Sequence, residues 1–217
     1  ISSALNFGVE KIETKYFLQI SPDIEFNFNK LEVFLNYAKE IKDKFAALGP
    51  RFINVKEKSH KQIDNKLEAG EIDSIHGSCM FINKENFKII GKFDENFFLY
   101  FEETEYCFRA KRKGYISYQI NLIEVETKGR SVEIDKETEQ KFNNILIWHF
   151  IWSKFYFSKK KYGNFFSILI FIPLLLRINI KILFYKILQN KKMSDKYKYR
   201  LNGLFKSMLG ESSDLRP

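Results

Sequence analysis

The stretch GKFDENFFLYFEETEYCFRAKRKGY, which runs from Gly91 to Tyr115, sets the pattern for the fold of this chain. Acidic residues open a predicted helix over 103–113, and the triplet Lys-Arg-Lys closes it. Gly114 follows where a left-handed residue commonly ends a helix, so both helix ends suit the helix dipole. Alternating apolar residues then predict a strand over 116–122. A helix that leads directly into a strand indicates an α/β sheet.

The residues before this stretch continue the alternation of strands and helices. The run YFLQI at 16–20 predicts a short strand, which Ser21-Pro22 ends. Apolar positions at helical spacing predict an amphipathic helix over 30–45, with Gly49-Pro50 as the break after it. Residues 54–72 are polar and lysine-rich, which favours a surface loop, and a further strand is predicted over 77–82. We therefore expect an α/β fold.

The C-terminal part of the chain differs in composition and charge. Residues 151–206 contain 13 Lys and Arg against one acidic residue, Asp195, whereas the rest of the chain has 23 basic and 26 acidic residues. The pattern becomes helical from about Glu133, so we predict an α/β domain over 1–132 and a helical, basic region over 133–217. The apolar run FFSILIFIPLLL at 165–176 is shorter than the ~18–20 residues that span a bilayer.

The basic region predicts a membrane partner rather than a nucleic acid. Cationic groups such as Lys159-Lys160-Lys161 accompany apolar residues, a combination that favours peripheral binding to anionic lipid at the cytoplasmic face of the cell membrane. Core-packing helices with a lysine-rich outer face are the alternative. No recognised nucleic-acid-binding module is present. Cys79 and Cys107 have neither disulfide nor metal-ligand spacing, which indicates reduced thiols in the cytoplasm.

Carboxylates at two places suit chemistry. Asp23 follows the end of the 16–20 strand, at the sheet edge where open α/β folds bind ligands, and it suits a divalent cation that bridges phosphates. It equally suits a simple turn cap. Glu102, Glu103 and Glu105 open the 103–113 helix, where a fixed carboxylate can act as a general base. The alternative is a solvated first turn with a Glu105–Arg109 pair.

The residues around these carboxylates leave two alternatives open. The aromatic run at 97–101 either lines a sugar pocket beside the acids or belongs to a core. Gly77, in the sequence HGSC, indicates close approach of backbone to a ligand. His76 is assigned no role, because a lone histidine is more often structural.

Three motifs together resemble the family-2 glycosyltransferases, specifically the rhamnosyltransferase-like branch. They are FLQISPD, then IHGSCMFINKENFKIIGKFDENFFLYFEETEYCFRAKRKGY, then ETKGRS, and the resemblance covers about 6–131. It implies a GT-A sheet with helices on both faces. It also implies inverting transfer of a sugar from a nucleotide-sugar donor, such as dTDP-rhamnose, to a glycan or lipid-linked acceptor. Cell-surface polysaccharide synthesis is the implied process.

The resemblance also implies roles for individual residues. Asp23 matches the ligand of a divalent cation, magnesium or manganese, with Ser21 and Asn6 on the donor side. Glu103 falls where the family has its general base, and Glu102 precedes it as the family's Glu does. The implied acceptor-side residues are Gly77, Ser78, Asp94, Glu95, Glu105 and Arg109, and Glu126 is the implied second metal ligand.

The chain departs from the family pattern in three places. Position 103 carries Glu where the family has Asp, and Glu126 stands where the family has His. The strand and nucleotide-base pocket that the family has before Asn6 are absent, so we expect an N-terminally incomplete domain that is inactive by itself. These departures keep a second hypothesis open, in which the chain is a catalytically inactive relative that serves as a membrane-associated scaffold or partner subunit.

Overall fold

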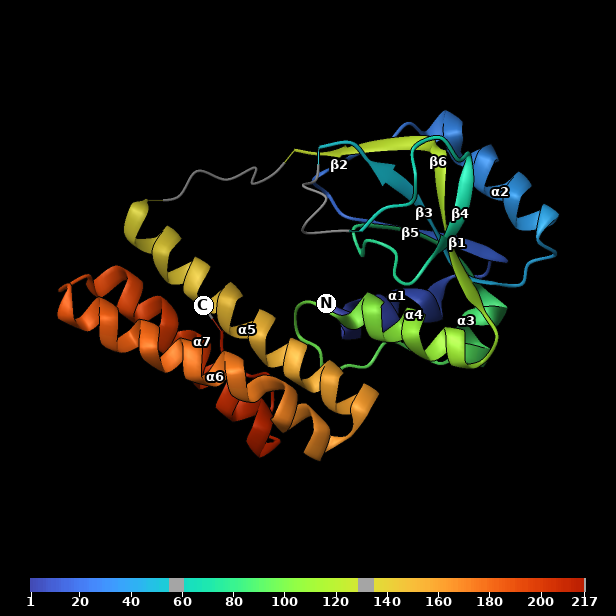
Figure 1. The fold of residues 1–217 in the computed structure, drawn as a ribbon. Coiled ribbons are helices and arrows are strands. Elements are labelled where there is room, and N and C mark those ends of the chain that lie inside the picture. Colours follow the sequence, from blue (N-terminus) through green and yellow to red (C-terminus); the bar gives the residue numbers. More distant parts are fainter. Residues whose placement is uncertain (55–60, 129–134, 217) are drawn as a thin grey trace. The chain divides into compact units, whose positions relative to one another are not determined.

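The computed structural model describes residues 1–54, 61–128 and 135–216, and the chain divides into two compact units. The sheet unit comprises 3–94 and 102–133, and the helical unit comprises 1–2, 95–101 and 134–217. Figure 1 shows the strands gathered in the first unit and long helices in the second. The segment 95–101 thus belongs to the helical unit, although the sequence placed it within the α/β region.

The sheet unit alternates helices and strands, as predicted. In chain order the elements are α1 (Ser2–Lys11), β1 (Tyr16–Ile20), β2 (Ile24–Glu25), the 3-10 turn η1 (Phe28–Lys30), α2 (Leu31–Glu40), β3 (Phe45–Phe52), β4 (Ala69–Ile72), β5 (Cys79–Asn83), α3 (Lys84–Ile90), α4 (Glu102–Arg112) and β6 (Ile116–Thr127). The strands follow the order β1-β5-β3-β6-β2, with β4 paired to β6. β3 and β6 are parallel, while β5 is antiparallel to both β1 and β3.

Helices cover both faces of this sheet, because the side chains of β5 alternate between two cores. Met80 and Ile82 are buried with residues of α1, α3 and α4. Phe81 points the other way, and its ring stacks on Phe34 of α2 with centroids 5.2 Å apart. The fold is therefore a mixed, open α/β sheet between helices, in agreement with the predicted α/β class.

Three strands were not predicted: the two-residue β2, then β3 and β4. β3 runs through Gly49-Pro50, which the sequence suggested as a break. A Cβ on Gly49 would lie 2.4 Å from Cγ2 of Ile75, so the close packing there requires glycine. Pro50 is tolerated because the register with β6 shifts between Pro50 and Arg51. β4 lies inside the predicted loop 54–72, where pairing with β6 compensates for weak strand propensity.

The helical unit contains α5 (Lys136–Tyr162), α6 (Asn164–Ile187) and α7 (Lys191–Leu209). The three helices share a core of Ile151, Phe155, Phe171, Ile178 and Leu204. α6 extends well beyond the predicted twelve-residue apolar run, because Pro173 lies within the helix without ending it. By length and composition alone, α6 is able to cross a membrane, which corrects the expectation that the apolar segment is too short.

The aromatic run before α4 packs against α5, although Tyr100 is 37% exposed. Phe97 is fully buried, with its ring 4.9 Å from that of Tyr156 in α5. Phe98 lies between His149 and Arg216. Tyr100 and Phe101 both adopt left-handed backbone conformations, with φ of +65° and +70°. Such residues cost about 1–2 kcal/mol each, so the chain enters α4 through a strained turn.

Candidate functional site

The turn that carries Asp23 is fixed on both sides by backbone hydrogen bonds. The Ser21 amide donates to the Ser78 carbonyl at 2.8 Å, and the Lys128 amide donates to the Asp23 carbonyl at 2.8 Å. The Ile24 amide closes the turn on the Ser21 carbonyl at 3.1 Å. Asp23 is half-buried at the end of β1. The predicted donor-side turn is therefore anchored to the loop that precedes β5.

That loop, residues 76–78, connects the Asp23 turn to the start of α4. Gln19 Nε2 donates to the Gly77 carbonyl at 2.5 Å, which ties the loop to β1. On its other side Gly77 packs against Glu103, since a Cβ added to Gly77 would lie 3.5 Å from the Glu103 Cγ. The structure thus places the predicted Gly77–Ser78 pair between the Asp23 turn and the predicted base.

The two acids that open α4 are electrostatically unusual. Glu102 is 7% exposed, and its Oε2 has no hydrogen-bond partner among the described residues. Burial, reinforced by the charge of Glu103, raises the pKa of Glu102 to about 7. Burial also raises the pKa of Glu103, while hydrogen bonds to its carboxylate, including one from the Thr104 hydroxyl at 2.9 Å, act against that rise. A carboxylate with a raised pKa is a stronger base than an ordinary surface glutamate.

Glu105 and Arg109, predicted on the acceptor side, pair with each other. Arg109 Nε and Nη2 donate to the Glu105 carboxylate at 3.0 Å, and Glu105 is 1% exposed. The same guanidinium donates to the carbonyl oxygens of Ile90, Gly91 and Lys92 at 2.7–3.0 Å. The pair therefore holds the end of α3 against α4. It confirms the Glu105–Arg109 pair of the alternative interpretation but not its solvated first turn, because Glu102 and Glu105 are buried.

Asn6 also has a structural partner. From α1, its Nδ2 donates to the Phe93 carbonyl at 2.9 Å, and its Oδ1 accepts from the Phe93 amide at 3.0 Å. Asp94 follows directly and is half-buried in the sheet unit, whereas Glu95 is exposed in the helical unit. Asn6 thus fixes the chain just before Asp94, and its predicted place on the donor side stays a prediction.

Glu126, the predicted second metal ligand, lies in β6 opposite Glu25 of β2, with its side chain exposed. Gly129, Arg130 and Ser131 of the same motif lie outside the described residues. Among the residues that the structure describes, no group of three or more His, Cys, Asp or Glu side chains could hold a metal ion. Magnesium is often held by one or two carboxylates together with substrate phosphates, and Asp23 alone fits that arrangement.

His76, to which the sequence analysis assigned no role, belongs to the same loop as Gly77. Its ring lies 4.4 Å from the Phe52 ring, and its Nδ1 accepts from the Ser78 amide at 3.3 Å. Burial lowers the pKa of His76, and the nearby charge of Asp23 only partly opposes this. The imidazole is therefore neutral at pH 7 and lies beside Asp23.

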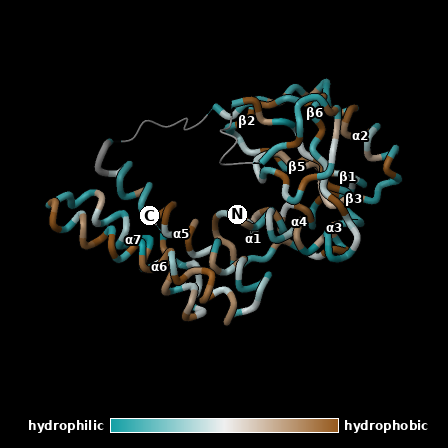
Figure 2. The backbone as a smooth tube through the Cα atoms, viewed as in Figure 1, coloured by the Kyte–Doolittle hydropathy of each residue, from teal (hydrophilic) through white to brown (hydrophobic). Residues whose placement is uncertain are grey.

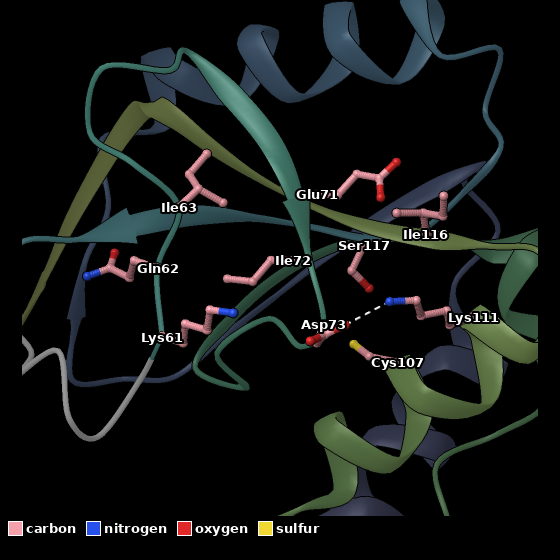
Figure 3. A pocket seen from close by; sticks show the side chains of 10 residues that line it. All are labelled: Lys61, Gln62, Ile63, Glu71, Ile72, Asp73, Cys107, Lys111, Ile116 and Ser117. Carbon is pink, nitrogen blue, oxygen red and sulfur yellow. Dashed lines mark hydrogen bonds and ion pairs between the residues drawn. The ribbon is translucent and has the colours of Figure 1, made fainter.

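A small cavity lies elsewhere in the sheet unit (Figure 3). Its volume is about 220 Å³, which is below the ~300–1,000 Å³ of typical small-molecule sites. An ion pair of 2.8 Å joins Lys111 and Asp73 at its edge. The residues that line it are Lys61, Gln62, Ile63, Glu71, Ile72, Asp73, Cys107, Lys111, Ile116 and Ser117. The cavity is thus lined by other residues than those of the Asp23 turn or the start of α4.

Comparison with known proteins finds one informative similarity. No family model matches the chain. The chain is 27% identical over 128 residues to the low-salt glycan biosynthesis hexosyltransferase Agl10 of Haloferax volcanii. The match covers 51% of this chain and 41% of that relative, so the chain spans less than half of the relative's length. The similarity is to a glycan biosynthesis enzyme, without indicating a rhamnosyltransferase branch.

Proposed function

We propose that this chain is part of an inverting glycosyltransferase that moves a sugar from a nucleotide-sugar donor to a glycan or lipid-linked acceptor. The observation that carries the proposal is the continuous contact from the Asp23 turn through Gly77 to Glu103. Similarity to a hexosyltransferase of glycan biosynthesis supports the same reaction class. The family-2 relationship, the GT-A fold and a role in cell-surface polysaccharide synthesis are parts of this proposal.

In this mechanism Glu103 removes the proton from the attacking acceptor hydroxyl. Its raised pKa makes it a competent base, and general-base assistance is typically worth ~10²–10⁴ in rate. Glu102, with a pKa of about 7, is poised to share or relay that proton. Gly77 brings the backbone of the loop before β5 close to Glu103, since an added Cβ would already be in contact with the Glu103 side chain. The acceptor hydroxyl is proposed to approach the Glu103 carboxylate beside this glycine.

On the donor side, Asp23 would hold a divalent cation, magnesium or manganese. When bound, this cation would offset the negative charge that builds on the departing nucleoside diphosphate. The hydrogen bonds that fix the Asp23 backbone keep the carboxylate in place before the donor arrives. His76, neutral and adjacent, offers a hydrogen bond to the same charged region. A rhamnosyl donor stays a proposal from resemblance alone.

Calorimetric titration with a panel of nucleotide sugars tests the proposal, with and without manganese, on the protein expressed from its complete gene. We expect metal-dependent binding of one donor class, and loss of that binding in Asp23→Ala. Glu103→Gln should retain donor binding but lose at least 10²-fold in turnover. Glu85→Gln is the matched control, because Glu85 also lies in a helix first turn but is exposed. A folded protein that binds no donor would favour the inactive-relative hypothesis.

A further inference from the structure

The outer face of α6 is a large exposed apolar surface. One narrow side of the helix, represented by Phe171 and Ile178, is buried in the core of the helical unit. Only 17% of the most apolar 18-residue window of α6 is buried, and Figure 2 shows the hydrophobic colour along this helix. The exposed side chains include Phe165, Phe166, Leu169, Ile172, Leu176 and Ile180. A patch of this kind marks an interaction surface.

The charges around this face indicate its partner. Lys159-Lys160-Lys161 end α5 just before α6, Lys186 lies in its last turn, and Lys191-Lys192 open α7. Residues 151–206 hold a single acidic residue, Asp195. A second copy of the chain would present the same positive charge and be repelled. An anionic lipid surface offers both the apolar layer and the opposite charge.

The packing of α6 against α5 and α7 favours one orientation of the helix in the membrane. α5 and α7 share its core, and they carry charged side chains such as Lys154, Lys196 and Arg200 along their length. If α6 crossed the bilayer with this bundle intact, those groups would enter the hydrocarbon, where charged side chains are strongly unfavourable. Lying along the surface buries only the outer face of α6.

We propose that the outer face of α6 is a membrane-docking surface that inserts shallowly into an anionic bilayer, with the helix axis along the membrane plane. This inference does not depend on the proposed enzymatic activity, since an inactive relative would bind lipid equally well. It places the chain at a membrane surface, where the lysines around α6 would contact anionic lipid. It also refines the expectation of peripheral binding, which the sequence attached to the whole C-terminal region.

Vesicle co-sedimentation of the 217-residue chain tests the proposal, with phosphatidylcholine vesicles that either contain or lack phosphatidylglycerol. We expect binding to the anionic vesicles at low salt. Replacement of Phe165, Phe166 and Leu176 by Gln should reduce the partition coefficient about 100-fold at any salt concentration. The matched control replaces Phe28, Leu67 and Ile89, which are equally exposed in the sheet unit, and should leave binding unchanged.

A charge variant separates the electrostatic contribution. Replacement of Lys186, Lys191 and Lys192 by Gln should weaken binding to anionic vesicles about 100-fold at low salt, with little effect at high salt. The same change at three exposed lysines of the sheet unit, Lys30, Lys39 and Lys66, is the control. If the control set weakened binding as much as the set Lys186, Lys191 and Lys192, the assignment to this face would be overturned.

Site-specific fluorescence keeps the proposal testable if a triple variant fails to fold. Cys79 and Cys107 are buried, so an environment-sensitive dye attached to Leu169→Cys labels one position on the outer face. We expect a blue shift with anionic vesicles at this position and none at Lys66→Cys. The proposal is refuted if the folded chain binds neither type of vesicle, or if it dimerises through this face. Resistance of the bound chain to carbonate extraction would show that α6 crosses the bilayer, which also refutes it.

Discussion

Replacing Arg109 by Met tests whether the Glu105–Arg109 pair stabilises the sheet unit or serves a substrate. The guanidinium lies 3.0 Å from the Glu105 carboxylate, which is almost completely buried, and it also binds the carbonyl oxygens of three residues at the end of α3. Removal of one partner of a buried ion pair typically costs 3–5 kcal/mol, because the remaining charge has no compensation. We therefore expect Arg109→Met to lower the free energy of unfolding by about 4 kcal/mol.

Urea unfolding followed by circular dichroism measures this loss. With a typical slope of about 2 kcal/mol per molar urea, the midpoint should fall by about 2 M. The double variant Glu105→Leu/Arg109→Met should regain most of the loss, because it leaves no buried charge. Lys88→Met, which breaks the exposed pair with Glu85, should cost less than ~1 kcal/mol. If Arg109→Met shifted the midpoint no more than Lys88→Met but weakened acceptor binding, the structural assignment would be refuted.

Three further predictions concern stability. Gly49→Ala should cost about 1–3 kcal/mol in urea unfolding, because its Cβ would clash with Ile75, and Ile75→Ala in the same chain should relieve the clash. Asn6→Ala should cost about 2 kcal/mol in the same assay, because it leaves both polar groups of the buried Phe93 backbone unpaired; an unchanged midpoint would contradict this. Between the ordinary pKa of 4.5 and about 7, folded Glu102 keeps a proton that the unfolded chain releases, so stability should fall as pH rises through this window. Glu102→Gln should reduce that fall, and the remainder should come from Glu103, whose pKa is also raised.

The sequence predicted most of the sheet unit because its local signals agree with its tertiary structure. The acidic start, basic end and left-handed Gly114 of α4 are all present in the structure. β3 could not be predicted, because Gly49 and Pro50 are unfavourable in strands and are accommodated only by the close packing of Ile75 and a register shift against β6. These are long-range conditions that no local pattern contains.

The site was predictable in its residue types but not in its contacts. Asp23, Gly77 and Glu103 were singled out by position, and the structure links them through the loop before β5. The sequence could not show that the carboxylate of Glu105 is taken up by Arg109, since spacing of four residues allows a helix pair without requiring it. Nor could it place His76 beside Asp23, because that proximity arises from the pairing of β1 with β5.

The segment 95–101 has a consequence for engineering and for evolution of the chain. It lies between two stretches of the sheet unit in sequence, yet Phe97 and Phe98 are packed among residues of α5 and the C-terminus. A truncation near residue 133 would therefore strip these aromatic rings of their packing partners only a few residues before Glu102. Each unit is compact, but a single cut in the chain cannot separate them, because 95–101 lies between two stretches of the sheet unit. Recombination or cloning that exchanges the helical unit would have to carry the seven residues 95–101 with it.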